Sequence, residues 1–239
     1  PLSGGMTLLP SMKMRLAAPS QLIDLARLPE LRGVEVEGGA LVVGAAMRHV
    51  EVADSAVVRA ALPALAALAG GIGDPQVRAR GTLGGSVANN DPAADYPAGV
   101  LACRAEVVTD RRTIEADAFF QGMFTTALGA DELITAIRFA IPKQAAYEKF
   151  AQAASGYAMT GVFVARYDDG VRVAVTGAAP CVFRWTEAEA ALSRRFAPEA
   201  VAQIRLPADG LNADQHAPAA YRAHLAHVML TRALERLCV

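Results

Sequence analysis

The spacing of apolar residues predicts several short strands before residue 145. Residues 41–45 are apolar and follow the Gly38-Gly39 pair, a pattern typical of a strand that begins after a tight turn. Residues 136–141 show the alternation of a strand, and Pro142 ends it. The same analysis predicts further strands at residues 22–25, 106–109 and 113–116, the last two as a pair.

Helical spacing predicts three helices. In residues 55–70 the apolar side chains recur on one helical face, with Ser55 as a suitable N-cap and the Gly70-Gly71 pair at the end. Residues 8–16 suit a short helix. The last helix is predicted at residues 221–237, where one stripe is formed by Leu225, Met229, Ala233 and Leu237.

A second unit is predicted from about residue 145 onward. It begins with strands at residues 147–151, 161–167 and 171–176. Asp168-Asp169-Gly170 lies between the last two strands and predicts a hairpin turn. We therefore expect a three-stranded antiparallel sheet followed by helices in this part of the chain.

Composition narrows the function classes. The 239 residues are 53% hydrophobic and 6% aromatic, with a formal net charge of -1, which disfavours a nucleic-acid-binding surface. No apolar run approaches the ~20 residues that cross a bilayer. The three cysteines are far apart and odd in number, so they suggest neither a disulfide framework nor an iron-sulfur site, and they favour a reducing compartment. His224 and His227 share helical spacing but have no third metal ligand nearby in sequence.

A glycine pair near the start of the chain predicts an anion-binding loop. In Ser3-Gly4-Gly5-Met6-Thr7 the glycines allow positive φ, so that several backbone N–H groups can face one concavity. The following helix would direct its N-terminus at the same anion. An ordinary tight turn is the alternative that the glycines alone leave open.

A second glycine-rich segment, residues 80–97, has the composition of a nucleotide site. It combines glycines, hydroxyls, amides and carboxylates that can approach and hydrogen-bond a ligand. It matches neither a P-loop nor a G-x-G-x-x-G turn, which indicates a different nucleotide fold. Residues 72–97 as a whole lack a clear period and predict an extended loop.

These motifs resemble one protein family over essentially the whole chain. The segments that carry the resemblance are SGGMTLLPSMKMRL, GDPQVRARGTLGGSVANNDPAADYP, DELITAIRFAIP, AYEKFAQAASGYA and the closing YRAHLAHVMLTRAL. They are similar to the FAD-binding medium subunit of molybdenum hydroxylases, a family that includes the carbon monoxide dehydrogenase medium chain and the FAD subunit of xanthine dehydrogenase. The resemblance implies an α+β fold, in which a two-subdomain FAD-binding domain of the PCMH type occupies residues 1–144 and a small C-terminal domain occupies residues 145–239.

The resemblance also implies roles for individual residues. The backbone of the first glycine loop would surround the FAD pyrophosphate, and the second loop would supply a further phosphate-side contact. Asp95 would be the carboxylate near FAD, Ile134 would contact the flavin or its chain, Lys149 would contact the flavin, and Tyr157 would lie against the isoalloxazine face. The loop residues in these roles are Ser3, Gly4, Gly5, Met6 and Thr7, then Thr82, Gly84, Gly85 and Ser86. Without the resemblance, Ile134, Lys149 and Tyr157 would be ordinary core or strand residues.

By resemblance, the chain would be a cytoplasmic electron-transfer subunit in a heterotrimer. A large molybdopterin subunit and a small iron-sulfur subunit would be its partners, and FAD would be its own cofactor. Met6 and Ser86 depart from the polar residue and the asparagine common in relatives. They motivate the alternative of a structural or assembly subunit that does not bind flavin, and a stand-alone flavin reductase is a third possibility. The chain opens at Pro1 rather than Met, and family members carry a strand-helix unit before the first glycine loop, so we expect the sequence to be incomplete.

Overall fold

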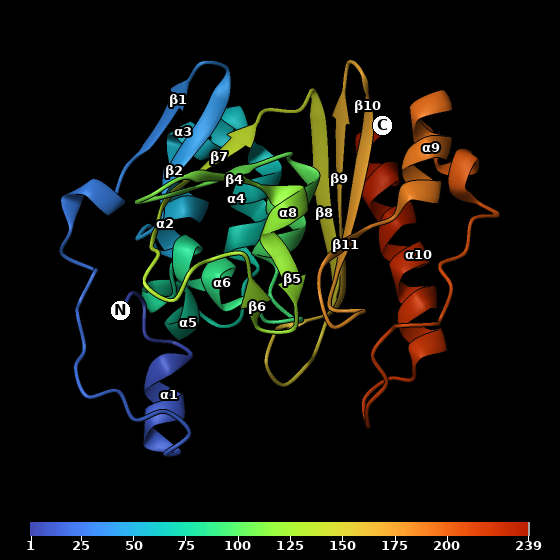
Figure 1. Cartoon of the computed structure of the whole chain (residues 1–239). Helices are drawn as coiled ribbons and strands as arrows, with labels where there is room; N and C mark the ends of the chain where they lie inside the picture. The colour runs from blue at the N-terminus through green and yellow to red at the C-terminus, as the bar shows by residue number, and fades with distance from the viewer. Residues whose placement is uncertain (239) are drawn as a thin grey trace.

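The computed structural model describes residues 1–238, which form a five-stranded, a four-stranded and a small two-stranded antiparallel sheet and a set of mostly short helices (Figure 1). The five-stranded sheet has the order β1-β2-β7-β3-β4, and a four-stranded sheet has the order β11-β10-β9-β8. The strands of the first sheet are β1 (Val34–Glu37), β2 (Ala40–Gly44), β3 (Glu106–Thr109), β4 (Thr113–Glu115) and β7 (Ile134–Ala140). The strands of the second are β8 (Gln144–Ala151), β9 (Ala158–Tyr167), β10 (Gly170–Thr176) and β11 (Phe183–Arg184).

Helices pack against the five-stranded sheet and against both faces of the four-stranded one. A small hairpin, β5 (Phe120–Gly122) and β6 (Thr125–Thr126), follows α8. The helices before it are α1 (Leu8–Lys13), α2 (His49–Asp54), α3 (Ala56–Ala61), α4 (Pro63–Gly70), α5 (Pro75–Arg80), α6 (Leu83–Asn89), α7 (Tyr96–Ala102) and α8 (Ala116–Phe119). The later ones are α9 (Thr186–Arg194) and α10 (Ala219–Leu237), and short 3-10 turns occupy Pro29–Leu31 and Pro198–Val201.

The α+β fold class and the strands of the second unit are confirmed. β9 and β10 pair antiparallel from Tyr167 and Gly170 outward, as the hairpin prediction requires, and β8 pairs with β9. The short β11 adds a fourth strand to the three predicted. The predicted pair β3 and β4 is also confirmed.

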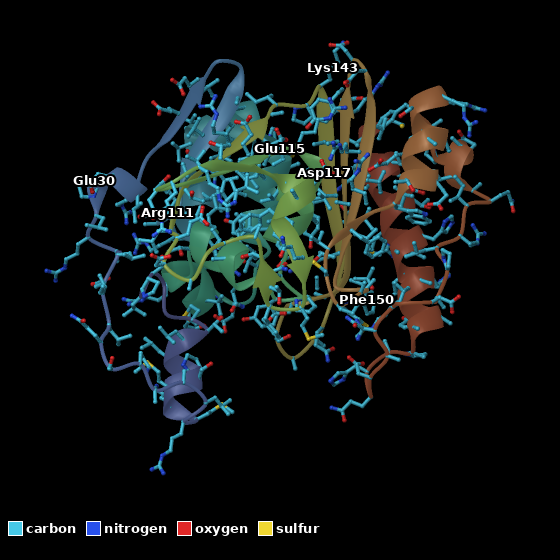
Figure 2. The ribbon with its side chains drawn as sticks, viewed as in Figure 1. Glu30, Arg111, Glu115, Asp117, Lys143 and Phe150 are labelled. Atoms are coloured by element: carbon cyan, nitrogen blue, oxygen red, sulfur yellow. The ribbon has the colours of Figure 1, made fainter. Side chains whose placement is uncertain are left out.

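Both faces of the four-stranded sheet are buried. Phe163 and Ala165 of β9 belong to the core shared with α4 and α7, whereas Val162 and Val164 belong to the core under α9 and α10. Figure 1 shows this arrangement, with the sheet between the N-terminal part and the two last helices. Asp117 of α8, labelled in Figure 2, reinforces the contact. It pairs with Arg172 and Arg184 on the sheet at 2.6 and 3.1 Å.

The prediction of an extended loop at residues 72–97 is wrong, because α5, α6 and the start of α7 lie there. Each of the first two has a side-chain N-cap: Asp74 accepts a hydrogen bond from the Val77 N–H, and Thr82 accepts one from the Gly85 N–H. Helices of six and seven residues are too short to produce a visible apolar period. Glycine usually opposes a helix, but Gly84 inside α6 is required by close packing, because a Cβ there would lie 2.5 Å from the Ala45 Cβ.

Two other predictions need correction. The helix expected at residues 55–70 is divided into α3 and α4, because Pro63 lacks the N–H that would continue α3. Its predicted N-cap is confirmed, since Ser55 accepts a hydrogen bond from the Val58 N–H. The strand expected at residues 22–25 is a single bridge between Leu2 and Asp24, whose carboxylate accepts from the nearby Ala26 N–H and turns the chain.

Within residues 1–238, no helix has both the length and the apolar character needed to cross a bilayer.

Candidate functional site

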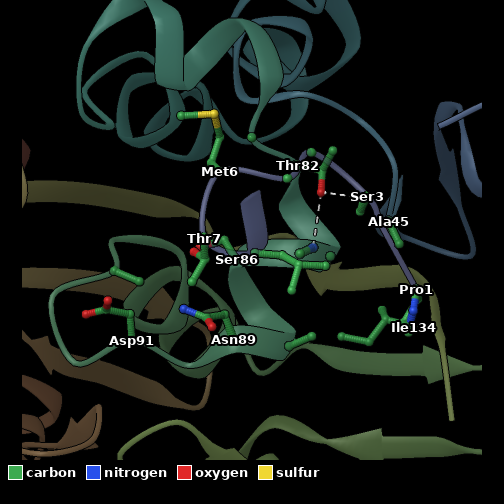
Figure 3. Close-up of a pocket in the computed structure, with 18 of the residues that line it drawn as sticks. Pro1, Ser3, Met6, Thr7, Ala45, Thr82, Ser86, Asn89, Asp91 and Ile134 are labelled. Carbon is green, nitrogen blue, oxygen red and sulfur yellow. Dashed lines mark hydrogen bonds between the residues drawn. The ribbon is translucent and has the colours of Figure 1, made fainter. Parts of the chain in front are cut away.

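A cavity of about 560 Å³ lies between the start of the chain, α6, the first residue of β7 and the loop before β9. This volume is typical of a site for a small molecule or cofactor. Figure 3 shows Met6, Thr7, Thr82 and Ile134 around it. Every residue proposed from the sequence lines the cavity except Lys149; those that do are Ser3, Gly4, Gly5, Met6, Thr7, Thr82, Gly84, Gly85, Ser86, Asp95, Ile134 and Tyr157.

The two glycine loops, far apart in sequence, lie against each other. The Ser3 and Thr82 hydroxyl oxygens are 2.8 Å apart, and Thr82 Oγ1 also accepts from the Gly85 N–H at 3.2 Å (Figure 3). A Cβ at Gly4 would lie 2.3 Å from the carbonyl oxygen of Arg80. Gly4 is therefore required by the contact between the loops, since any larger residue would separate them.

The first loop presents unused hydrogen-bond donors. The backbone N–H groups of residues 3–8 have no acceptor among the hydrogen bonds found within residues 1–238. Gly5 has φ +73°, a conformation that turns consecutive amides toward one side. Unpaired amides are costly unless water or a ligand accepts from them, so this wall of the cavity suits an anionic group with many acceptor atoms.

The second loop is held from beneath by residues that sequence reasoning missed. The Gly84 N–H donates to the Ala45 carbonyl at 2.8 Å, and the His49 N–H donates to the Gly81 carbonyl at 2.9 Å. A Cβ at Gly84 would lie 2.5 Å from the Ala45 Cβ. The available signal was the small pair Ala45-Ala46 directly after a strand, which allows another backbone to approach closely.

His49 lies under this loop with its ring almost fully buried. Its ring centroid is 5.3 Å from that of Tyr96, and its Nδ1 has no hydrogen-bond partner among the described residues. Burial, reinforced by the charge of Arg78, lowers the pKa of His49 to about 4. The imidazole is therefore neutral near pH 7.

This pKa predicts a pH-dependent stability. The unfolded chain, with a histidine pKa near 6.5, binds more protons than the folded chain between pH 4 and 6.5. The free energy of unfolding should thus fall as the pH falls through that window, by about 1.4 kcal/mol per pH unit at most, and be fully retained above it. Urea unfolding from pH 4 to 7 should show a shallower slope in His49→Phe, which keeps a ring beside Tyr96. His216→Phe, at an exposed histidine, is the control and should keep the wild-type slope. Equal slopes in wild type and His49→Phe would show that the lowered pKa of His49 does not cause this pH dependence.

Lys149 does not line the cavity, and its ammonium group lies beside Asp95 behind the wall. Lys149 Nζ is 2.8 Å from Asp95 Oδ1, which also accepts a hydrogen bond from the Tyr147 hydroxyl at 2.7 Å. Asp95 is 1% exposed, and burial raises the pKa of its carboxyl while Lys149 and Tyr147 oppose that shift. Tyr147 was not among the proposed residues; the signal was its position two residues before Lys149, on the same face of a strand.

Comparison with known proteins decides the family. Residues 1–144 match the family model described as "FAD binding domain in molybdopterin dehydrogenase". The chain is 39% identical over 253 residues to the carbon monoxide dehydrogenase medium chain of Hydrogenophaga pseudoflava, covering 98% of this chain and 87% of the relative. The chain belongs to the FAD-binding medium subunits of the molybdenum hydroxylases.

Other relatives extend this result. A nicotine 6-hydroxylase medium subunit of Paenarthrobacter nicotinovorans is 38% identical over 248 residues, covering 98% of this chain and 87% of the relative. The solved carbon monoxide dehydrogenase of Hydrogenophaga pseudoflava superimposes with a TM-score of 0.86 at 38% identity, covering 98% of this chain and 87% of that one. The chain is thus an oxidoreductase subunit of this family, and its cofactor is FAD.

The cavity of this medium subunit fits FAD on structural grounds. A pyrophosphate carries several acceptor oxygens, which match the free amides of residues 3–8. Other parts of the lining are less polar, and they include Ile134 at the start of β7 and Tyr157, which is 41% exposed. Met6 and Ser86, the two departures from the family pattern, also line the cavity, and neither side chain blocks the contact between the loops.

Proposed function

We propose that this medium subunit transfers electrons through FAD, taking them from iron-sulfur clusters of a partner subunit and passing them to an external acceptor. The observation that carries the proposal is the convergence of the two glycine loops on one cavity, with the free N–H groups of residues 3–8 along its wall. When bound, FAD supplies reversible electron transfer, and the protein supplies binding and orientation.

In this proposal each part of the cavity has a separate task. Backbone amides of Ser3, Gly4, Gly5, Met6 and Thr7 hold the pyrophosphate, and the second loop, with Thr82, Gly84, Gly85 and Ser86, forms a further part of the wall on the phosphate side. Ile134 and Tyr157 exclude water beside the isoalloxazine ring. Asp95 lies on the same wall, and its Oδ2 is buried without a hydrogen-bond partner among residues 1–238.

We further propose that the subunit works within a cytoplasmic heterotrimer. The names "medium chain" and "medium subunit" of the relatives support partners of other sizes, which would be a large molybdopterin subunit and a small iron-sulfur subunit. Within the chain, residues 1–144 would form the FAD-binding domain and residues 145–239 the C-terminal medium-subunit domain. Phe163 and Ala165 of the second part belong to the core of the first part, which implies that the two parts remain packed together.

A visible absorption spectrum tests the proposal directly. The purified protein is incubated with FAD, desalted and scanned, and we expect near-stoichiometric flavin bands. The same sample mixed with its co-expressed large and small subunits should then lose flavin absorbance when the complex is given its reducing substrate. Complexes that assemble without retaining flavin would favour the structural or assembly subunit, and flavin reduction without any partner would favour the stand-alone reductase.

A further inference from the structure

Lys149 connects three separate parts of the chain. Its Nζ lies 2.8 Å from each of three acceptors: the Gly71 carbonyl after α4, the Gly156 carbonyl in the β8–β9 loop, and Asp95 Oδ1 before α7. An ammonium group has three donors, so these contacts satisfy it completely. Its side chain is 13% exposed, which makes it a structural cation rather than a solvated one.

Each acceptor is part of the cavity wall or adjoins it. Asp95 lines the cavity, Gly71 precedes the lining residue Ile72, and Gly156 precedes Tyr157. The loop is also constrained by the backbone, because the Gly156 N–H donates to the Gln152 carbonyl and the Gln152 N–H donates to the Tyr157 carbonyl, both at 2.8 Å. Lys149 therefore holds three wall segments from behind.

The same contacts stabilise the buried carboxylate of Asp95. Burying a carboxylate is costly unless a cation and hydrogen bonds accompany it. Lys149 and Tyr147 both reach Oδ1, which leaves Oδ2 without a partner among the described residues, on the side chain that lines the cavity. Removing the ammonium group would leave Asp95 buried without its cation.

We propose that Lys149 is a positioning residue of the flavin site, which holds the Tyr157 loop and the Asp95 carboxylate at the cavity wall without touching the flavin itself. The effect of Lys149 on bound flavin rests on the proposed FAD function, whereas its hold on the loop does not. The positioning can be measured in the protein without FAD.

Hydrogen exchange of the ligand-free protein tests the positioning. In Lys149→Met, the amides of Gln152 and Gly156 should exchange at least about tenfold faster, because a hydrogen bond from a charged donor to their loop is lost. The matched control is Lys143→Met. Lys143 is an exposed lysine directly before β8, paired with Asp168 and distant from Phe150, the neighbour of Lys149 (Figure 2). Unchanged exchange in Lys149→Met, or equal acceleration in Lys143→Met, would overturn the proposal.

A second variant separates positioning from loss of stability. Lys149→Met combined with Asp95→Asn has no unpaired buried charge, so it should fold even if the single variant does not. In this double variant the Gln152 and Gly156 amides should still exchange about tenfold faster than in Asp95→Asn alone. The reason is that the double variant lacks the hydrogen bond from Lys149 to the Gly156 carbonyl, which Asp95→Asn keeps. Equal rates in these two proteins would contradict a direct hold on the loop.

The consequence for FAD is a separate measurement. If wild type retains FAD, the bound flavin in Lys149→Met should fluoresce several-fold more strongly, because a displaced Tyr157 quenches it less. Lys143→Met should match wild type. Unchanged fluorescence beside fast loop exchange would refute the link to the flavin, whereas a wild type that retains no FAD would refute the proposed function and leave the exchange result standing.

Discussion

Replacing Gly5 with aspartate is expected to abolish FAD retention. The substitution places a carboxylate in the loop whose free amides are proposed to hold the pyrophosphate. Two like charges about 4 Å apart repel by about 4 kcal/mol at the effective dielectric constant of a protein surface, which is on the order of a 1000-fold loss of affinity. Equilibrium titration with FAD, followed by flavin fluorescence, measures the change.

The matched control for this prediction is Gly5→Asn. Asparagine has nearly the same size as aspartate, carries no charge and tolerates the positive φ of +73° better than most residues. A Cβ here would lie 2.8 Å from Leu9 Cδ1, so both variants share a modest local rearrangement. Gly5→Asn should therefore bind FAD more tightly than Gly5→Asp. The difference in binding free energy should be most of the charge repulsion given above. Equal affinities of the two would show that charge at this loop is irrelevant, and assembly with partner subunits should be intact in both.

The largest effect on stability is expected from Phe163→Ala. Phe163 is 0% exposed on β9, and its ring centroid lies 6.1 Å from that of Tyr147 within the core shared with α4 and α7. Truncating such a side chain leaves a cavity and should lower the free energy of unfolding by about 3–5 kcal/mol. Urea unfolding followed by tryptophan fluorescence measures it, because Trp185 is buried on the other side of the sheet.

The location of Phe163 makes this variant a test of coupling between the two parts of the chain. Since both faces of the sheet are buried, the five-stranded sheet and the last helices should unfold in one transition. Far-ultraviolet circular dichroism and Trp185 fluorescence should shift together in Phe163→Ala. Phe150→Ala, on the same sheet but 38% exposed, is the control and should cost much less. Two separated transitions would contradict the coupling.

Local patterns predicted most of the strands because strand periodicity and turn residues lie close together in sequence. The β9–β10 hairpin is an example, since Asp168-Asp169-Gly170 and the flanking apolar runs carry the whole signal. The same local patterns did not predict the helices in residues 72–97. There the helices depend on N-caps at Asp74 and Thr82 and on contacts with Ala45, a residue from another segment.

The binding loops could be proposed from the sequence because glycine pairs, hydroxyls and their order along the chain resemble a family pattern. The contact between the loops could not, since it depends on a Gly4 that fits against Arg80 from a distant segment. Lys149 was expected beside the flavin because its position matched a family lysine. The contacts of its ammonium group within the chain, with Asp95, Gly71 and Gly156, came only from the structure.

The sequence by itself therefore determined the fold class, the family and the FAD cofactor, and it predicted the residues of the two glycine loops. These properties can be predicted from local spacing and from motifs whose residues are neighbours along the chain. The tertiary structure alone decided that the loops form one cavity, that His49 is neutral beneath it, and that Lys149 holds its wall from behind. Those properties depend on burial and on distances between residues far apart in sequence, because desolvation and hydrogen bonding act only once the chain has brought the groups together.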